Sequence, residues 1–240
     1  MERMTNIKKI EKEIENFLKI KKIIKDKKIL ITAGPTFEPI DPIRYIGNFS
    51  SGKQGYEIAN CAYTYGAETI LITGPTNIEP PEVNKIIKVQ SAKQMFNESM
   101  KICKKYKPID VAFLAAAVSD WKISKSNKKY KKNENIFKQI KFKENKDILH
   151  MISNLKKNRP KIVCGFAAET NSLISNARKK LINKNCDFIF ANKISNKFNP
   201  LGNDFNQISI IGKNKLKNWN KMSKKRVAEK IIQEVSSYLN

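Results

Sequence analysis

The sequence predicts an α/β protein in which a parallel sheet is covered by helices on both faces. Short apolar segments typical of buried strands alternate with amphipathic segments typical of helices along most of the 240 residues. Gly34-Pro35 and Gly74-Pro75 end the first two strands, because glycine and proline interrupt regular structure. Strands that are apolar throughout are typical of parallel sheets, which are buried on both faces.

Hydrophobic spacing and helix-capping residues set the expected element boundaries. Apolar residues at positions 7, 10, 14 and 17 predict one amphipathic helix over residues 1–27. Ser51 and Gly66 bound a second predicted helix. The predicted strands are residues 28–33, 69–73, 85–90, 110–118, 161–167, 187–191 and 207–211, and the remaining predicted helices are 91–106, 147–157, 172–184 and a last one from 221.

Residues 121–146 interrupt this alternation. The segment holds ten lysines and two glutamates without a helical or strand period, so we expect a flexible loop. The chain is therefore predicted to consist of an N-terminal amphipathic helix, residues 1–27, and a single domain, residues 28–240, that contains this loop.

The net charge of +25, from 47 basic and 22 acidic residues, favours anionic partners. Forty-two of the basic residues are lysine, which lacks the planar fork with which arginine reads nucleic acids. Lysine, asparagine and isoleucine are abundant throughout the chain. Compositional bias is therefore favoured over polyanion binding as the main source of the charge.

Several classes of protein are disfavoured by simple counts. The longest apolar run, Val111–Val118, is far shorter than the ~20 residues that span a membrane. Charged residues at positions 8, 9, 11 and 13 interrupt any signal-peptide core, so we expect a cytoplasmic protein. His150 is the only histidine and no CxxC pair occurs, which argues against Ser-His-Asp catalysis, a zinc site and a disulfide framework.

Ligands in such folds bind beyond the carboxyl ends of the strands, so the segments after residues 33, 118, 167 and 191 are candidates. Residues 47–54 match the GxxxxGK phosphate loop, but Gln54 stands where the magnesium-binding Ser or Thr belongs. That departure argues against a P-loop NTPase. The serines, glycine and lysine of this segment suit either an anion site or an ordinary helix cap.

Further segments carry weaker signals. Residues 115–120 offer small side chains to a flat ligand and Asp120 to a metal, or else form an Asx turn beside a packed helix. The lysines at 128–132 are typical of a solvated surface. Residues 165–170 again place small residues at a strand end, and Lys180 and Lys184 lie on one helical face that suits a single anion.

Taken in order, these segments form a longer pattern. It comprises ITAGPT at 31–36, EPIDP at 38–42, RYI at 44–46, Asn48, SSGK at 50–53, AAV at 116–118 with Asp120, KxKK at 129–132 and GFAAETN at 165–171. From about Lys28 to the C-terminus, the chain resembles bacterial phosphopantothenate–cysteine ligase, also called phosphopantothenoylcysteine synthetase, of coenzyme A biosynthesis.

The resemblance implies a Rossmann-like three-layer αβα fold with a mostly parallel central sheet, a homodimer, CTP as co-substrate and Mg²⁺ as cofactor. The implied reaction converts 4′-phosphopantothenate to an acyl-cytidylate with release of pyrophosphate, and cysteine then displaces CMP to give 4′-phosphopantothenoylcysteine. Only about 27 residues precede the first strand, too few for the decarboxylase fused to many relatives. We therefore expect a stand-alone ligase, a separate phosphopantothenoylcysteine decarboxylase, and no membrane or specific nucleic-acid partner.

The matched motifs imply roles for individual residues. Asn48 would hold the acyl-phosphate intermediate, and Lys129 would be the catalytic lysine, with Lys128 as its rival because the loop is one residue short. Asp120 would face the triphosphate and its metal ion. The implied substrate-phosphate positions are Asn48, Ser50, Ser51, Gly52 and Lys53, and the implied nucleotide-binding positions are Ala115, Ala116, Asp120, Lys129, Asp147, Ile148, Phe166, Lys180 and Lys184.

Three positions depart from the family pattern. Phe37 replaces a frequent arginine, Phe49 replaces a frequent histidine, and Lys193 replaces the aspartate that usually follows Asn192. Lys193 therefore receives no role. The helix at residues 1–27 precedes every matched motif and is expected to be dispensable for catalysis.

Two alternative functions stay open at this point. An RNA-binding protein would use the lysines of residues 122–146 with Tyr130, Phe137 and Phe142, although these aromatic residues lack a regular stacking arrangement. An NAD-binding Rossmann protein would need a GxGxxG motif after the first strand, and none follows it.

Overall fold

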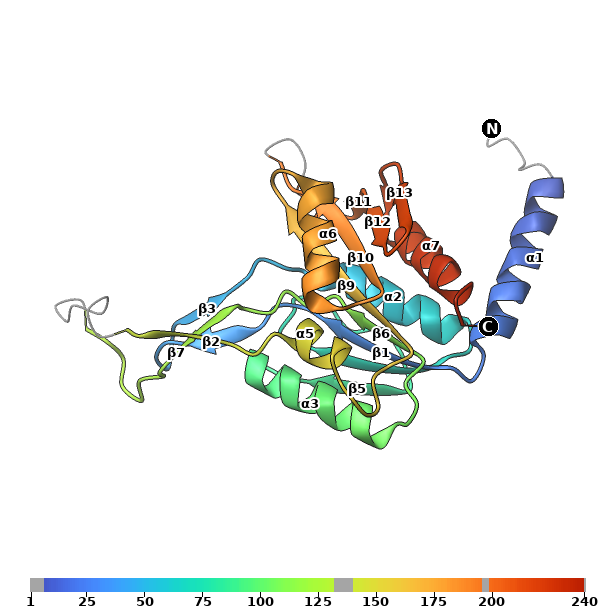
Figure 1. Cartoon of the computed structure of the whole chain (residues 1–240). Helices are drawn as coiled ribbons and strands as arrows, with labels where there is room; N and C mark the ends of the chain where they lie inside the picture. Colours follow the sequence, from blue (N-terminus) through green and yellow to red (C-terminus); the bar gives the residue numbers. More distant parts are fainter. Residues whose placement is uncertain (1–6, 132–139, 196–198, 240) are drawn as a thin grey trace.

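The computed structural model describes residues 7–131, 140–195 and 199–239. At its centre lies an eight-stranded sheet (Figure 1). Its strands are β1 (Lys28–Ala33), β4 (Glu68–Thr73), β5 (Lys85–Lys88), β6 (Val111–Leu114), β9 (Ile162–Glu169), β10 (Phe188–Lys193), β12 (Ser209–Gly212) and β13 (Lys215–Asn218). Within this sheet only the pairs β10–β12 and β12–β13 are antiparallel, which confirms the predicted mostly parallel arrangement.

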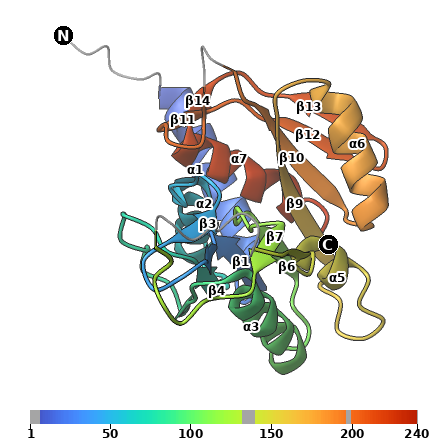
Figure 2. The same cartoon turned by 90° about the vertical axis from the view of Figure 1, so that its left-hand side faces the viewer.

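Helices cover both faces of the sheet, and together they form three layers (Figure 2). One face packs against α2 (Lys53–Thr64), α7 (Lys224–Ser236) and the end of α1 (Ile7–Ile24). The other packs against α3 (Ala92–Lys105), α5 (Ile148–Ser153) and α6 (Leu173–Lys184). Ile29 and Ile31 of β1 enter the first core and Leu30 enters the second, because successive strand residues point to opposite faces.

The order of the parallel strands creates a crevice at one edge of the sheet. From β5 the order runs β4, β1, β6, β9 and β10, as in a doubly wound Rossmann fold. β1 is the first strand in the chain. β4 and β5 extend the sheet on one side of it, and β6, β9 and β10 extend it on the other. The connections after β1 and β6 therefore diverge to opposite faces, and ligands bind where they part.

Some predicted elements differ in length from those in the structure. The strand predicted at 110–118 ends at Leu114, because Gly34 leaves β1 with a φ of +75° and only a bridge from Pro35 to Ala117 continues the pairing. The helix predicted at 147–157 ends at Ser153, where the Asn154 side chain donates a 2.8 Å hydrogen bond to the His150 carbonyl. At the C-terminus, the last helix begins at Lys224, after a two-residue strand, β14 (Met222–Ser223), paired with β11 (Phe205–Asn206).

The segment expected to be a flexible loop is partly regular. β7 (Trp121–Ile123) and β8 (Phe142–Glu144) pair at its two ends, while residues 132–139 lie outside the described residues. A second hairpin, β2 (Phe37–Pro39) and β3 (Tyr45–Gly47), was not predicted and lies beside β7. These four strands form an extension, here called the arm, that projects from the domain (Figure 1).

Of the N-terminal helix predicted over residues 1–27, α1 covers Ile7–Ile24, and residues 1–6 lie outside the described residues. The two ends of α1 differ in environment. Ile20 and Ile24 are buried in the core, whereas Ile7 and Ile14 are exposed. Within the described residues, no helix is both long and apolar enough to cross a membrane.

Candidate active site

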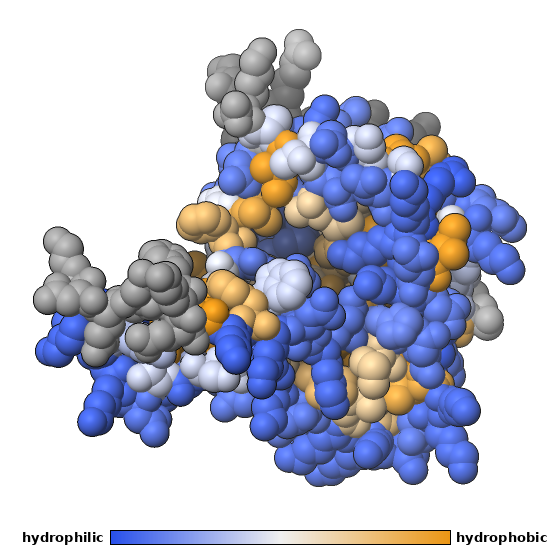
Figure 3. Space-filling model, turned by 60° about the vertical axis from the view of Figure 1, so that its left-hand side comes forward, coloured by the Kyte–Doolittle hydropathy of each residue, from blue (hydrophilic) through white to orange (hydrophobic). Residues whose placement is uncertain are grey.

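Two adjoining cavities lie at the carboxyl edge of the sheet, where β1 and β6 end. Their volumes are about 340 and 150 Å³. They share the lining residues Ala116, Val118, Asp120, Phe166 and Lys180. Figure 3 shows the molecule hollowed on the side that carries the arm. A larger hollow, of about 1190 Å³, lies at the opposite edge near the start of β10 and contains none of the predicted site residues.

The larger of the two adjoining cavities is lined by the start of α2. Gly52 precedes this helix with a φ of +74° and has no side chain to cap it. A Cβ atom at Gly55 would lie 2.6 Å from the Cβ of Ala33, so the glycine allows α2 to pack directly against β1. The N-terminus of α2 therefore faces the cavity with its backbone N–H groups and its positive dipole end, which together suit an anion.

Segments distant in sequence converge around this helix start. The Asn48 side-chain amide donates a 2.9 Å hydrogen bond to the carbonyl of Val118, and the Ser51 hydroxyl donates one of 3.0 Å to the carbonyl of Leu201. The ammonium of Lys53 lies 2.6 Å from the carboxylate of Asp204, and this hydrogen bond raises the pKa of Lys53. The predicted substrate-phosphate residues Asn48, Ser50, Ser51, Gly52 and Lys53 all line this cavity.

The boundary between the cavities is formed by small residues and one lysine. Ala115 and Ala116 leave the backbone after β6 accessible, because their side chains fill little space. The ammonium of Lys180 donates a 2.8 Å hydrogen bond to the carbonyl of Phe166, and burial lowers the pKa of Lys180. Asp120 borders both cavities, and its carboxylate forms no hydrogen bond or salt bridge with a described residue.

The smaller cavity reaches the start of α5. Ile148 and Asp147 line it, and the Asp147 carboxylate caps the helix by accepting a 2.7 Å hydrogen bond from the His150 backbone N–H. Burial alone would raise the pKa of Asp147. The cap and the nearby ammonium of Lys184 nevertheless hold it below its usual value.

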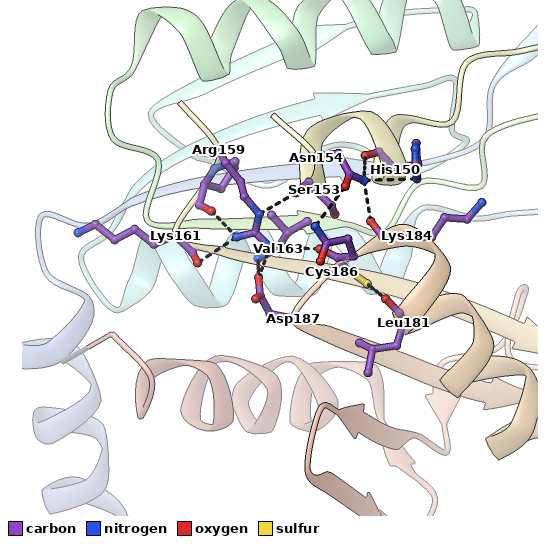
Figure 4. Close-up of polar contacts among 12 residues, drawn as sticks. His150, Ser153, Asn154, Arg159, Lys161, Val163, Leu181, Lys184, Cys186 and Asp187 are labelled. Atoms are coloured by element: carbon purple, nitrogen blue, oxygen red, sulfur yellow. Dashed lines mark hydrogen bonds and ion pairs between the residues drawn. The ribbon is translucent and has the colours of Figure 1, made fainter. Parts of the chain in front are cut away.

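A polar network ties α5 to α6 beneath this cavity (Figure 4). The side chain of Asn154 donates hydrogen bonds to the carbonyls of His150 and Lys184. The guanidinium of Arg159 pairs with Asp187 at 2.9 Å, and the same carboxylate oxygen accepts the backbone N–H of Val163 at 2.7 Å. With the hydrogen bonds from Arg159 to the carbonyls of Ser153 and Asn185, these contacts hold the C-terminal end of α5 against that of α6.

Two predicted residues lie outside the cavity linings. Lys184 contacts Asp147 but borders neither cavity. Lys129 and its rival Lys128 are exposed beside the arm, where Tyr130 is fixed by a 3.3 Å hydrogen bond from its backbone N–H to Asp41. The structure thus brings together all the predicted site residues except Lys129 and Lys184, and the role of Lys129 stays a prediction.

The structure also adds lining residues that no motif indicated. Pro200, Leu201, Asn206 and Lys224 come from the C-terminal third of the chain and line the larger cavity. Asn192 lines it as well, whereas Lys193 is exposed beyond it. The signal that could have indicated Lys224 is the basic start of the last helix, because the first turn of α7 contains three basic residues and no acid.

The strand order and the crevice at its switch point define a Rossmann-like α/β protein. Residues 24–239 match the family described as the DNA/pantothenate metabolism flavoprotein C-terminal domain. The chain belongs to this family.

Two curated relatives carry the same name. The coenzyme A biosynthesis bifunctional protein CoaBC of Borreliella burgdorferi is 42% identical over 233 residues, which cover 96% of this chain and 57% of that protein. The CoaBC protein of Bacillus subtilis is 36% identical over 216 residues, covering 89% of this chain and 52% of that protein. The chain therefore spans little more than half the length of these relatives.

Solved structures show the same fold. The C-terminal domain of a CoaBC protein is 33% identical, with a TM-score of 0.74 over 90% of this chain and 97% of that one. A Cab2 mutant in complex with phosphopantothenate-cysteine is 16% identical, with a TM-score of 0.69 over 96% of this chain and 93% of that one. At that identity the second likeness concerns the fold alone.

Proposed function

We propose that this chain is a phosphopantothenate–cysteine ligase that activates 4′-phosphopantothenate with CTP and joins it to cysteine. One observation carries the proposal. Residues matched to phosphate and nucleotide positions, from Asn48 to Lys180, come from five separate segments of the chain and line two adjoining cavities at the switch point. Such convergence is unexpected if the motifs serve only as helix caps and turns.

The relatives support the same pathway. The bifunctional CoaBC proteins, which are 42% and 36% identical to this chain, are named for coenzyme A biosynthesis. Because the chain matches only part of each CoaBC protein, their activity is extended to it here as part of the proposal. A separate decarboxylase as the next enzyme rests on the sequence resemblance alone and stays a prediction.

The site has the chemistry that the reaction requires. A carboxylate becomes a good electrophile once its oxygen carries a phosphoryl leaving group, and transfer of a nucleotidyl group needs mainly positioning and positive charge around the phosphates. The N-terminus of α2 and the ammonium of Lys180 provide that charge at the larger cavity. Cysteine supplies its own amine as the second nucleophile, so the reaction does not require a histidine.

Asp120 fits the magnesium ion that the family implies. Its exposed carboxylate borders both cavities and has no hydrogen-bonding partner among the described residues. Mg²⁺ at nucleotide sites is usually held by one or two carboxylates together with the phosphates. When bound there, the ion would neutralise charge on the nucleotide phosphates.

The arm suits the interface of a homodimer. Ile43, Tyr45, Trp121 and Phe142 on this extension are between 48% and 60% exposed. Exposed apolar side chains gathered on one projection are typical of a protein contact. We therefore expect a dimer in solution, which light scattering after size-exclusion chromatography measures directly.

The direct test is pyrophosphate release from CTP on addition of 4′-phosphopantothenate. Without cysteine we expect a single burst that leaves acyl-cytidylate on the enzyme, and with cysteine we expect continuous turnover. Replacing CTP by ATP should slow the reaction strongly, because a base with the wrong polar edge leaves buried donors unpaired. Equal turnover with ATP would contradict the nucleotide preference. RNA binding with a steep salt dependence and no pyrophosphate release would favour the alternative function.

A further inference from the structure

Lys224 is a buried lysine that neither the motifs nor the proposed reaction accounts for. It is only 3% exposed, and it lines the larger cavity beside the start of α2. Its ammonium forms no hydrogen bond or salt bridge with a described residue. Buried charges in proteins are almost always paired, so an unpaired buried lysine facing a cavity indicates a missing partner.

The surroundings make this charge costly in the absence of a ligand. Burial and the neighbouring Lys53 lower the pKa of Lys224 to about 8, with Asp204 and Glu57 opposing the shift. Lys224 is also the first residue of α7, whose first turn holds no acid. Cations at a helix N-terminus oppose its dipole. An anion in the cavity would offset both the cost of burying the ammonium and its repulsion by the N-terminal end of the α7 dipole.

Two helix N-termini meet at this point. α2 begins at Lys53 and α7 begins at Lys224, and both residues line the same cavity. The side chain of Gln54 donates a 3.2 Å hydrogen bond to the carbonyl of Lys224, and the backbone N–H of Lys224 donates one of 2.9 Å to the carbonyl of Asp204. The two helix starts are therefore held in a fixed relation.

Of the two lysines at this junction, only Lys53 has a counter-ion among the residues that the structure describes. Lys53 pairs with the carboxylate of Asp204 at 2.6 Å. Lys224 lies close enough for that carboxylate to influence its pKa but is not bonded to it. The ammonium of Lys224 is therefore the one available to bind an anionic ligand.

We propose that Lys224 binds a phosphoryl group held between the N-termini of α2 and α7. The identity of the substrate rests on the proposed function, which offers two sources in this cavity, the phosphate monoester of 4′-phosphopantothenate and the triphosphate of CTP. Both groups present anionic phosphate oxygens. Measuring the binding of each ligand separately shows which of the two groups Lys224 contacts.

The test compares the wild-type chain with Lys224→Met, Lys224→Arg and Lys225→Met. Lys225 is the adjacent residue and is exposed, so Lys225→Met controls for the loss of one positive charge. Titration calorimetry with 4′-phosphopantothenate, pantothenate, CTP and inorganic pyrophosphate gives each dissociation constant. We expect Lys224→Met to weaken binding of a phosphorylated ligand by roughly ten- to a hundredfold, Lys224→Arg to restore part of it, and Lys225→Met to change it little.

The pattern of losses identifies the source. Weaker binding of 4′-phosphopantothenate, with CTP unchanged, assigns Lys224 to the acid substrate, whereas weaker binding of CTP and pyrophosphate assigns it to the nucleotide. Unchanged binding of every phosphorylated ligand by a folded Lys224→Met protein would overturn the proposal, and Lys224→Gln serves if the methionine variant does not fold. If the wild type binds pyrophosphate but turns over no substrate, the proposed function fails while the lysine is still tested by pyrophosphate.

Discussion

Lys184 in α6 and Asp147 at the start of α5 form an ion pair of 2.8 Å. Both were predicted to bind the nucleotide, yet only Asp147 lines a cavity. Lys184 contacts the carboxylate that caps α5. Its effect on a ligand is therefore expected to pass through Asp147, which would make Lys184 a positioning residue.

Substitutions at Asp147 separate its two interactions. Asparagine at this position still caps α5 but loses the ion pair with Lys184, whereas alanine loses both. We expect Asp147→Ala to reduce the free energy of unfolding by about 1–2 kcal/mol and Asp147→Asn by clearly less. Urea denaturation of the two variants gives the comparison. Equal losses would mean that the ion pair, and not the cap, carries the stabilisation.

The central fold was predictable because its signal is local. In β1, Ile29, Leu30 and Ile31 are all buried, since helices cover both faces of the strand, and such continuous apolar runs are readable from one segment of sequence. The arm was missed for the opposite reason. Its strands are only three residues long, and the stacking of Phe37 on Tyr45 at 3.8 Å between ring centroids is a contact that periodicity does not reveal.

The site residues also differ in whether the sequence alone could predict them. Gly52 and Phe166 belong to continuous motifs, and the structure brings these motifs to shared cavities. Lys224 belongs to no motif, and its environment arises from Lys53 and Asp204, which only the folded chain brings near it. Lys129 shows a further limit, because a matched motif gives a residue its role but not its position relative to the cavities.

Lys224 should destabilise the ligand-free protein. Its pKa falls from 10.5 to about 8 on folding, mainly through burial. Between these values the unfolded chain binds more protons than the folded chain, so the free energy of unfolding rises with pH in this interval. Below about pH 8 the ammonium is protonated in both states, so the full cost of burying its charge is present.

Lys224→Met removes this penalty, so we expect the ligand-free variant to unfold at higher urea concentration than the wild type near neutral pH. The advantage should shrink as the pH rises from about 8 toward 10.5, while Lys225→Met shows no such trend. Saturating pyrophosphate should stabilise the wild type more than the variant. A stability difference that is constant across the pH range would show that methionine packing, and not lysine desolvation, is responsible.

Truncation of α1 should separate stability from catalysis. Ile20 and Ile24 are 7% and 1% exposed, whereas Ile10 and Ile14 are 44% and 52% exposed. A chain starting at Lys27 loses both buried isoleucines, each contributing about 1.5–3 kcal/mol of burial, whereas a chain starting at Glu15 retains them. Because α1 lines neither cavity, pyrophosphate release per folded molecule should stay near that of the full chain in both. Complete loss of activity in a well-folded truncation would contradict this expectation.

Asn48 and Lys129 are predicted to serve different half-reactions. Asn48 lines the larger cavity, and its amide nitrogen donates to the carbonyl of Val118. Its amide oxygen has no hydrogen-bonding partner among the described residues, so it can contact the substrate. A neutral amide suits the acyl-phosphate that cysteine attacks. Lys129 would instead supply a positive charge, which the proposed reaction needs when the α-phosphate of CTP is attacked.

Single-turnover experiments quenched in acid separate these roles. Lys129→Gln should slow pyrophosphate release by ~10²–10³, because one preorganised electrostatic contact is lost, and no acyl-cytidylate should accumulate. Asn48→Asp replaces the nitrogen that donates to Val118 by an oxygen, yet activation should proceed, so acyl-cytidylate should build up before cysteine consumes it. If both variants stall before pyrophosphate release, the two residues act in the same step. Both lysines are exposed, so their burial does not decide between them. If Lys128→Gln is damaging and Lys129→Gln is not, the register of the motif is shifted by one residue.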